Sequence, residues 1–187
     1  MLRKMLCEAL LVVTLLVTTV HGGVVCDGVD DILTLSTNIT TNSTYTVTAW
    51  VRPTTGSAAT AAAFVYTDSP FNGLYFHGTP TVYWSIYSGG SAGSFDSNTT
   101  TLDAVHHVAL VSNAGSGTFY LDGVADTTGS IDTTTQFHGM CNDPAAEAFT
   151  GTVMNIALYD TALTAQEVQS LAGSKLQNTA LTRARQV

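Results

Sequence analysis

The stretch from Phe149 to Ala172 constrains the fold most, because it joins a strand pattern directly to the start of a helix. Residues 149–159 are apolar at both alternating sets of positions and rich in β-branched side chains, which is typical of a central strand. Thr164 and Glu167 then stand at the spacing of a capping box, in which each side chain accepts a hydrogen bond from an N–H group at the helix start. The pattern predicts a central strand and then a helix of about two turns that ends at Gly173.

The same stretch and three others resemble one family. The residues from Phe149 to Val168 are similar to the closing strand and short helix of laminin-G-like jelly rolls, in the concanavalin A-like lectin and glucanase superfamily. Further motifs follow in the family's order: Asp27-Gly-Val-Asp-Asp31, Tyr45-Thr-Val-Thr-Ala-Trp-Val-Arg-Pro53, and His106-His-Val-Ala-Leu-Val111 with Gly117-Thr-Phe-Tyr-Leu-Asp-Gly123. The resemblance implies an all-β fold, an antiparallel β-sandwich (jelly roll) of two sheets with one short C-terminal helix. It implies little about function, because lectins, adhesive modules, virion proteins and enzymes share this fold.

The chain divides into three parts. Residues 1–22 have a basic start and an apolar run from Ala9 to Val20, which is too short to span a bilayer comfortably. We expect a secretory signal peptide cleaved near Gly22 or Gly23, and the alternative is an uncleaved N-terminal arm or first strand. The laminin-G-like domain is expected over residues 23–173, followed by a weakly basic tail, residues 174–187.

The expected domain is strongly acidic. Between residues 23 and 173 there are thirteen Asp and Glu residues against the single cation Arg52, a net charge of −12. A body of this sign repels phosphate backbones and anionic lipid. The composition therefore argues against nucleic-acid partners. Because the apolar run of the leader is short, we also expect no stable membrane span. The expected location is extracellular or on a virion surface.

Several well-known catalytic motifs are missing from the sequence. In the glucanases of this superfamily two carboxyl groups lie on one strand as Glu-x-Asp-x-x-Glu, whereas the glutamates here are Glu8, Glu147 and Glu167. No nucleophile elbow or phosphate-binding loop is present either. The histidines show no recognisable zinc-ligand spacing. We therefore predict that the protein is not an enzyme.

The resemblance suggests calcium as a cofactor. Laminin-G-like domains commonly hold Ca²⁺ with loop carboxylates, and this hard cation prefers oxygen ligands. The corresponding residues are Asp27, Asp30 and Asp31. The alternative is that these residues only form a carboxylate-capped turn.

If the chain is secreted, its cysteines and its Asn-x-Ser/Thr sequons predict two covalent modifications, a disulfide and N-linked glycans. Removal of residues 1–22 takes away Cys7 and leaves Cys26 and Cys141, and an even count in a secreted chain favours a disulfide. The resemblance also makes this bridge reasonable, because the first strand of such jelly rolls lies near the last; the alternative is two small buried hydrophobic residues. In a secretory cell, glycans are expected at Asn38, Asn42 and Asn98.

Two classes of function fit these features. The first is a non-catalytic extracellular recognition module that binds carbohydrate or glycoprotein through rim loops. Its expected ligand-binding residues are aromatic and polar: Asn72, Tyr75, Trp84, Tyr87 and Asp96. The second is a structural or decoration protein of a virion or extracellular assembly, in which copies of the chain contact each other. Aromatic residues are more often core than ligand-binding. Trp50 is therefore expected in the core, and the alternative is that it stacks on a sugar.

Overall fold

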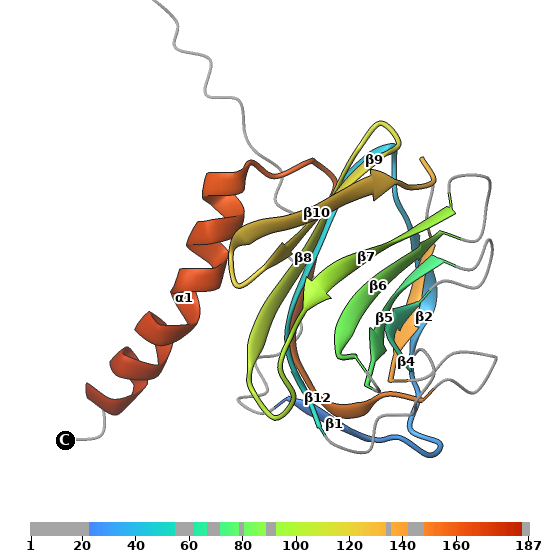
Figure 1. The fold of residues 1–187 in the computed structure, drawn as a ribbon. Helices are drawn as coiled ribbons and strands as arrows, with labels where there is room; N and C mark the ends of the chain where they lie inside the picture. Colours follow the sequence, from blue (N-terminus) through green and yellow to red (C-terminus); the bar gives the residue numbers. More distant parts are fainter. Residues whose placement is uncertain are drawn as a thin grey trace, which may run out of the picture.

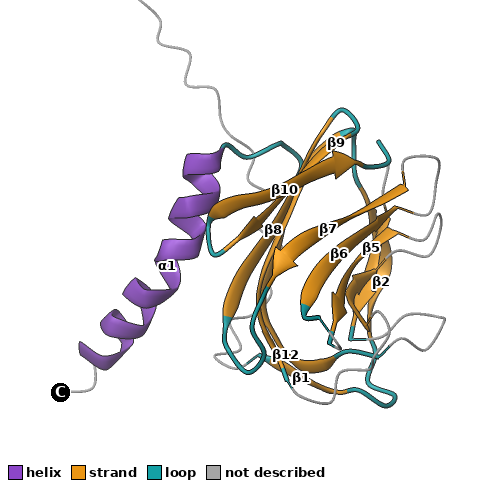
Figure 2. Ribbon diagram, in the orientation of Figure 1, coloured by secondary structure: helices purple, strands orange, loops and turns teal. Residues whose placement is uncertain are grey.

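Alternating apolar and polar residues build two antiparallel sheets that pack face to face in the computed structural model (Figure 1, Figure 2). The structure describes residues 23–54, 62–66, 72–78, 81–88, 93–133, 136–141 and 148–184, so the expected leader, residues 1–22, lies outside them. The first sheet has the order β1 (Val24–Asp27), β12 (Thr150–Tyr159), β3 (Thr44–Pro53), β8 (His106–Asn113), β9 (Ser116–Leu121) and β10 (Val124–Ser130). The second has the order β2 (Leu33–Thr40), β11 (Gln136–Met140), β4 (Ala62–Tyr66), β5 (Asn72–His77), β6 (Tyr83–Ser88) and β7 (Gly93–Thr99). The predicted all-β antiparallel sandwich is confirmed.

The core lies between the two sheets. Side chains alternate across each strand, and β3 turns Tyr45, Val47, Ala49 and Val51 into this core. From the second sheet, β5 and β6 contribute Leu74, Phe76, Trp84 and Ile86. The other positions of these strands consequently point away from the core, onto the two outer faces of the sandwich.

Trp50 corrects one prediction, because it lies on an outer face and not in the core. It alternates with the core residues of β3 and is partly exposed. Its ring meets the ring of His107 edge-on, with 5.1 Å between the centroids. The two side chains therefore form a contact on the outer face of the first sheet.

Strand β12 is internal, as predicted, since it pairs with β1 on one side and β3 on the other. Its register shifts between Met154 and Ala157, where Asn155 has a φ of 49°. Val153 faces the core before this bulge, and Ile156 and Leu158 pack against the core after it. A bulge inserts one residue, which explains how residues of opposite parity reach the same face.

Two tight hairpin turns connect the last three strands of the first sheet. Ala114 and Gly115 join β8 to β9 with φ values of 51° and 89°, and Asp122 and Gly123 join β9 to β10 with φ values of 53° and 82°. Two successive residues with positive φ match the twist of the flanking strands. The two turns thus hold β8, β9 and β10 together as one antiparallel unit.

Helix α1 (Ala165–Ala184) starts at the predicted capping box. The Thr164 N–H donates to Glu167 Oε2 at 2.7 Å, and the Glu167 N–H donates to Thr164 Oγ1 at 3.3 Å. The Thr164 Oγ1–H also donates to Glu167 Oε2, at 2.8 Å. The two bonds that Thr164 donates to this carboxylate lower the pKa of the exposed Glu167. Val168 is fully buried against Ala109, Val111 and Tyr120 on the outer face of the first sheet.

The predicted end of this helix is wrong. The helix continues through Gly173 to Ala184, and Figure 1 shows its later part extending away from the sandwich. Glycine weakens a helix by only about 1 kcal/mol relative to alanine, and the residues after it contain no proline. No helix in the described part of the chain is long and apolar enough to cross a membrane.

Candidate functional site

The outer face of the second sheet carries a row of rings from β5 and β6. Leu74 and Phe76 of β5 and Trp84 and Ile86 of β6 point into the core, so the alternate positions point outward. These outward positions hold four ring-bearing residues: Tyr75, His77, Tyr83 and Tyr87. We call these four residues the outer aromatic row.

The rings of the outer aromatic row form two pairs. His77 lies opposite Tyr83 in the strand register, and their rings stack with 4.4 Å between the centroids and 5° between the planes. Tyr87 lies opposite Gly73, and its ring meets that of Tyr75 edge-on at 6.0 Å. Tyr75 is 5% exposed and Tyr87 is 47% exposed. The buried Tyr75 therefore contacts Tyr87 at one side, and much of the Tyr87 ring is open to solvent.

Polar groups lie beside these rings. Asp96 on β7 is exposed and lies opposite Ser85 of β6 in the register. Burial lowers the pKa of His77, and the negative charge of Asp96 partly opposes this shift. Near pH 7 His77 is therefore neutral, with one ring nitrogen as a donor and one as an acceptor. The face combines apolar rings with hydrogen-bonding groups, which is the composition of many small-ligand sites.

Among the expected ligand-binding residues, Trp84 is the clear error. Its side chain is fully buried in the core and lies 4.8 Å from Phe76 between ring centroids. The cause is strand parity, because Trp84 alternates with Tyr83 and Tyr87 along β6. Tyr75 lies on the outer face of β5 and not in a rim loop, and it is too buried to be an open ligand contact. Tyr87 and Asp96 are exposed.

Asn72 opens β5 opposite Ser88, and its side chain lies outside the described part of the structure. His77 and Tyr83 belong to the face although sequence reasoning did not select them. The signal that could have found them is the alternation in Leu74-Tyr-Phe-His77 and Tyr83-Trp-Ser-Ile-Tyr87. In each strand, alternate residues must face the same side of the sheet, so His77 and Tyr83 share the outer face with Tyr75 and Tyr87.

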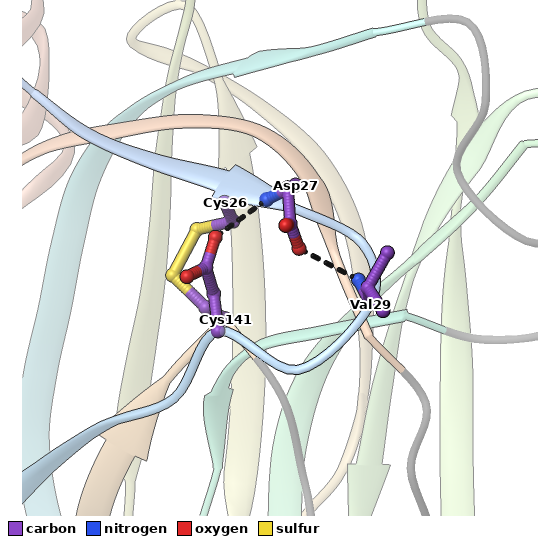
Figure 3. Close-up of a disulfide and its surroundings, with 5 residues drawn as sticks. Cys26, Asp27, Val29 and Cys141 are labelled. Carbon is purple, nitrogen blue, oxygen red and sulfur yellow. Dashed lines mark hydrogen bonds between the residues drawn. A yellow bond between two sulfur atoms is a disulfide. The ribbon is translucent and has the colours of Figure 1, made fainter.

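The acidic residues Asp27, Asp30 and Asp31 come together in the loop between β1 and β2. One carboxylate oxygen from each residue lies within 4.8 Å of the others. The Val29 N–H donates to Asp27 Oδ1 and the Asp27 N–H donates to Asp31 Oδ2, both at 2.8 Å (Figure 3). A Ca²⁺ ion binds oxygen at about 2.3–2.6 Å, so two of its ligands lie at most about 5 Å apart. The donor type and spacing fit this ion, and the internal hydrogen bonds equally fit the expected capped turn.

The structure contains the expected disulfide between Cys26 and Cys141, with 5.5 Å between the Cα atoms (Figure 3). Cys26 lies in β1 of the first sheet, and Cys141 directly follows β11 of the second. Both residues are almost fully buried. The bridge therefore connects the two sheets beside the acidic loop.

The three sequons differ in their surroundings. Asn42 is exposed between β2 and β3, whereas the side chain of Asn38 lies outside the described part of the structure. Asn98 is exposed, but its Nδ2 donates to Asp126 Oδ1 at 2.6 Å and its backbone N–H donates to Asp126 Oδ2 at 2.8 Å. Asn98 thus links β7 of one sheet to β10 of the other.

A second polar cluster joins the loop before β8 to the turn after β9. His106 Nδ1 lies 2.8 Å from Asp122 Oδ2, and its Nε2 lies 2.9 Å from Thr101 Oγ1. Asp122 Oδ1 also accepts the backbone N–H of His107 at 2.9 Å. The connectivity of carboxylate, imidazole and hydroxyl is that of nucleophilic hydrolases, and here it also fastens the ends of two strands.

A family model described as the concanavalin A-like lectin/glucanases superfamily matches residues 27–169. No curated protein sequence matches the chain significantly. A native heptameric SAP-like pentraxin from Limulus polyphemus superposes with a TM-score of 0.64 at 15% identity, over 79% of this chain and 80% of the pentraxin.

Two further solved structures share the fold. Domain 4 of an extracellular arabinanase from Geobacillus stearothermophilus, in complex with arabinotriose, gives a TM-score of 0.57 at 20% identity, over 79% of this chain and 75% of that domain. Trypanosoma rangeli sialidase gives 0.56 at 21% identity, over 72% of this chain but only 23% of the sialidase. At these identities the likeness establishes the fold, and function has to be argued from the site.

Proposed function

We propose that this chain, which belongs to the concanavalin A-like lectin/glucanases superfamily, is a non-catalytic extracellular recognition module that binds carbohydrate. The proposed site is the outer aromatic row with Asp96, on strands β5, β6 and β7. It replaces the rim loops that the sequence suggested. The expected signal peptide and the disulfide support an extracellular location, since disulfides persist in oxidising compartments.

The observation that carries the proposal is the open ring of Tyr87 beside hydrogen-bonding groups. Tyr87 is 47% exposed, and its ring contacts the ring of the buried Tyr75 edge-on. A sugar has apolar C–H faces that can pack on such a ring and hydroxyl groups that can bond to His77 and Asp96. A rigid ring loses little conformational entropy on binding. The solved arabinanase domain in complex with arabinotriose is consistent with sugar binding on this fold.

The absence of paired carboxylates on this sheet supports a non-catalytic role. Asp96 is the one acidic residue in strands β2, β11, β4, β5, β6 and β7, whereas glycoside hydrolysis normally requires two carboxyl groups flanking the bond. The Thr101–His106–Asp122 chain is the alternative catalytic group, and we assign it to holding the two strand ends. Hydrolysis of a p-nitrophenyl ester that Thr101→Ala abolishes, with folding retained, would contradict this assignment.

A calcium ion at Asp27, Asp30 and Asp31 remains a separate proposal, supported by the carboxylate spacing. Its expected effect is on stability, because an ion that binds only the folded chain adds about 1.4 kcal/mol at tenfold excess over its Kd. Calcium should therefore raise the Tm relative to EDTA, and Asp30→Asn should remove the increase. An identical Tm with EDTA and millimolar calcium would contradict the calcium proposal and leave the sugar proposal intact.

The direct test of function is oligosaccharide binding by wild-type protein and two Tyr87 variants. Neutral oligosaccharides, arabinotriose among them, are titrated by calorimetry after screening on a glycan array. Tyr87→Ala should weaken binding by about tenfold or more, the loss typical of a contact that dominates a site. Tyr87→Phe keeps the ring and should retain most of the affinity. Val124→Ser changes an exposed residue of the first sheet, so it serves as a surface control and should leave binding unchanged.

Two results would contradict the proposal. One is sugar binding that Tyr87→Ala leaves unchanged, since the site must then lie elsewhere. The other is the absence of glycan binding together with elution as a large self-assembly, which would favour the structural or decoration role.

A further inference from the structure

The face that carries the outer aromatic row has a negative charge and no strand residue to neutralise it. Asp96 is exposed on β7, and its charge is close enough to His77 to affect the pKa of that ring. No Lys or Arg occurs in any of the six strands of the second sheet. His77 itself is neutral near pH 7 because burial lowers its pKa.

The one cation of residues 23–173 is Arg52, and it belongs to the other sheet. It lies on β3, at an outward position that alternates with the core residue Val51. Its Nε–H donates to the Asp103 carbonyl oxygen at 3.1 Å, and its Nη2 lies 3.8 Å from Asp103 Oδ1. Arg52 therefore points to the opposite side of the sandwich from the outer aromatic row.

Recognition of a sugar carboxylate or sulfate generally uses Arg, Lys or another concentrated set of donors. An anionic sugar on this face would lose water around its charge without gaining a cationic partner. It would also approach Asp96 and a domain whose residues 23–173 sum to −12. The lost hydration and the repulsion by Asp96 are local effects. The repulsion by the net charge of the domain acts at longer range and weakens with salt.

We propose that the outer aromatic row selects uncharged glycans and rejects those that carry a carboxylate or sulfate group. This inference rests on the proposed function and adds the ligand class. Specificity here is a difference between two affinities, created by an unfavourable contact with the wrong ligand. Asp96 is the residue that creates it, while Tyr87 supplies the packing that both ligand classes would share.

The test uses pairs of oligosaccharides that differ only in charge. α-1,4-Galactotriose is compared with trigalacturonate, and lactose with its 3′-sialylated and 3′-sulfated forms. Binding is measured at pH about 7.5, where His77 is neutral, with EDTA to prevent bridging by a divalent cation. The uncharged member of each pair should bind about tenfold more tightly or better, and the ratio should fall as salt is raised.

Two charge variants separate the local effect from the net charge. Asp96→Lys should reduce the preference within each pair by about tenfold, through better binding of the anionic member. Asp160→Lys makes the same change in net charge at an exposed residue after β12 and should leave the preference nearly unchanged. Melting curves establish that both variants are folded.

The outcomes distinguish this inference from the proposed function. An anionic member that binds wild-type protein as tightly as its uncharged partner, or a preference that Asp96→Lys does not alter, overturns the inference alone. Binding of neither member in any pair overturns the proposed function and the inference with it.

Discussion

His107 is the residue whose burial has the most direct consequence for stability. It is 1% exposed, packs against Trp50 on the outer face of the first sheet, and its Nδ1 has no hydrogen-bond partner within the described structure. Burial lowers the pKa of this ring from 6.5, and the charge of Asp122 only partly opposes the shift. The folded protein therefore holds His107 in its neutral form.

The free energy of unfolding should consequently fall as the pH drops below 6.5, the ordinary value for His107. Below that pH the unfolded chain binds a proton that the folded chain rejects, and above it the two states are equally neutral. His107→Phe keeps a ring beside Trp50 and removes the titration, so the slope of stability against pH should become shallower. Urea unfolding between about pH 5 and 8 measures this slope.

His77 should contribute to the pH dependence of unfolding that remains in the His107→Phe variant, because burial also lowers the pKa of His77. His77→Phe should therefore flatten it further, in the same direction. A His107→Phe variant with the wild-type pH dependence would show that the ring is not held neutral by the fold.

At the scale of elements, the contact between α1 and the β9–β10 turn fixes the helix on the first sheet. A Cβ atom added at Gly123 would lie 2.9 Å from the Ala172 Cβ and 3.1 Å from the Gln169 Cα. Gly123 also has a φ of 82°, a conformation that costs other residues about 1–2 kcal/mol. Both effects require glycine at this position.

The same substitution at two glycines should therefore have opposite effects. Gly123→Ala should lower the free energy of unfolding by at least about 1 kcal/mol, from backbone strain alone. Gly173→Ala lies inside α1 with nothing within 4 Å of the new Cβ, and should raise helix stability by up to about 1 kcal/mol. Chemical denaturation and hydrogen exchange in α1 measure the two effects, and equal effects would contradict the placement of the helix.

Sequence patterns predicted the elements well where one signal dominated. The capping box at Thr164 corresponds to the start of α1, and the apolar stretch of residues 149–159 corresponds to the internal strand β12. The helix end was wrong because glycine is only a weak stop when suitable residues follow it. The bulge at Asn155 depends on pairing with β3, which a single strand does not reveal.

The candidate site was predicted less completely because β6 carries large apolar or aromatic residues on both parities. Trp84 and Ile86 on one side and Tyr83 and Tyr87 on the other are equally suited to burial. Which side faces the core is decided by the other sheet, so the sequence alone could not separate the exposed Tyr87 from the buried Trp84. The exposure of Asp96 is easier to predict, because an unpaired carboxylate is rarely buried.

At the scale of the whole molecule, two links hold the sheets together from opposite sides. The Cys26–Cys141 disulfide joins β1 to the end of β11. Asn98 and Asp126 join β7 to β10, the strands at the other edge of each sheet. These links hold the second sheet against the first, and so help to keep the strands of the outer aromatic row in place.

Removal of the disulfide should cost a large part of the stability. The bridged residues are 115 positions apart, and closing a loop of this length stabilises a protein by about 5 kcal/mol in the chain-entropy model. The Cys26→Ser, Cys141→Ser double variant should lose about this amount in urea unfolding. Reductant should destabilise wild-type protein similarly and leave the double variant unchanged; equal stability of oxidised and reduced wild type would contradict the prediction.

The central claim is that sugar binds the outer face of the second sheet. The most direct measurement is a titration of ¹⁵N-labelled protein with a neutral oligosaccharide such as arabinotriose, or the best uncharged array ligand, followed by amide chemical shifts. We predict that the shifts concentrate in β5, β6 and β7, around Tyr87, His77 and Asp96, and that Tyr87→Ala removes them. Shifts that concentrate in the β1–β2 loop or on the outer face of the first sheet, or no shifts with any glycan, would contradict the claim.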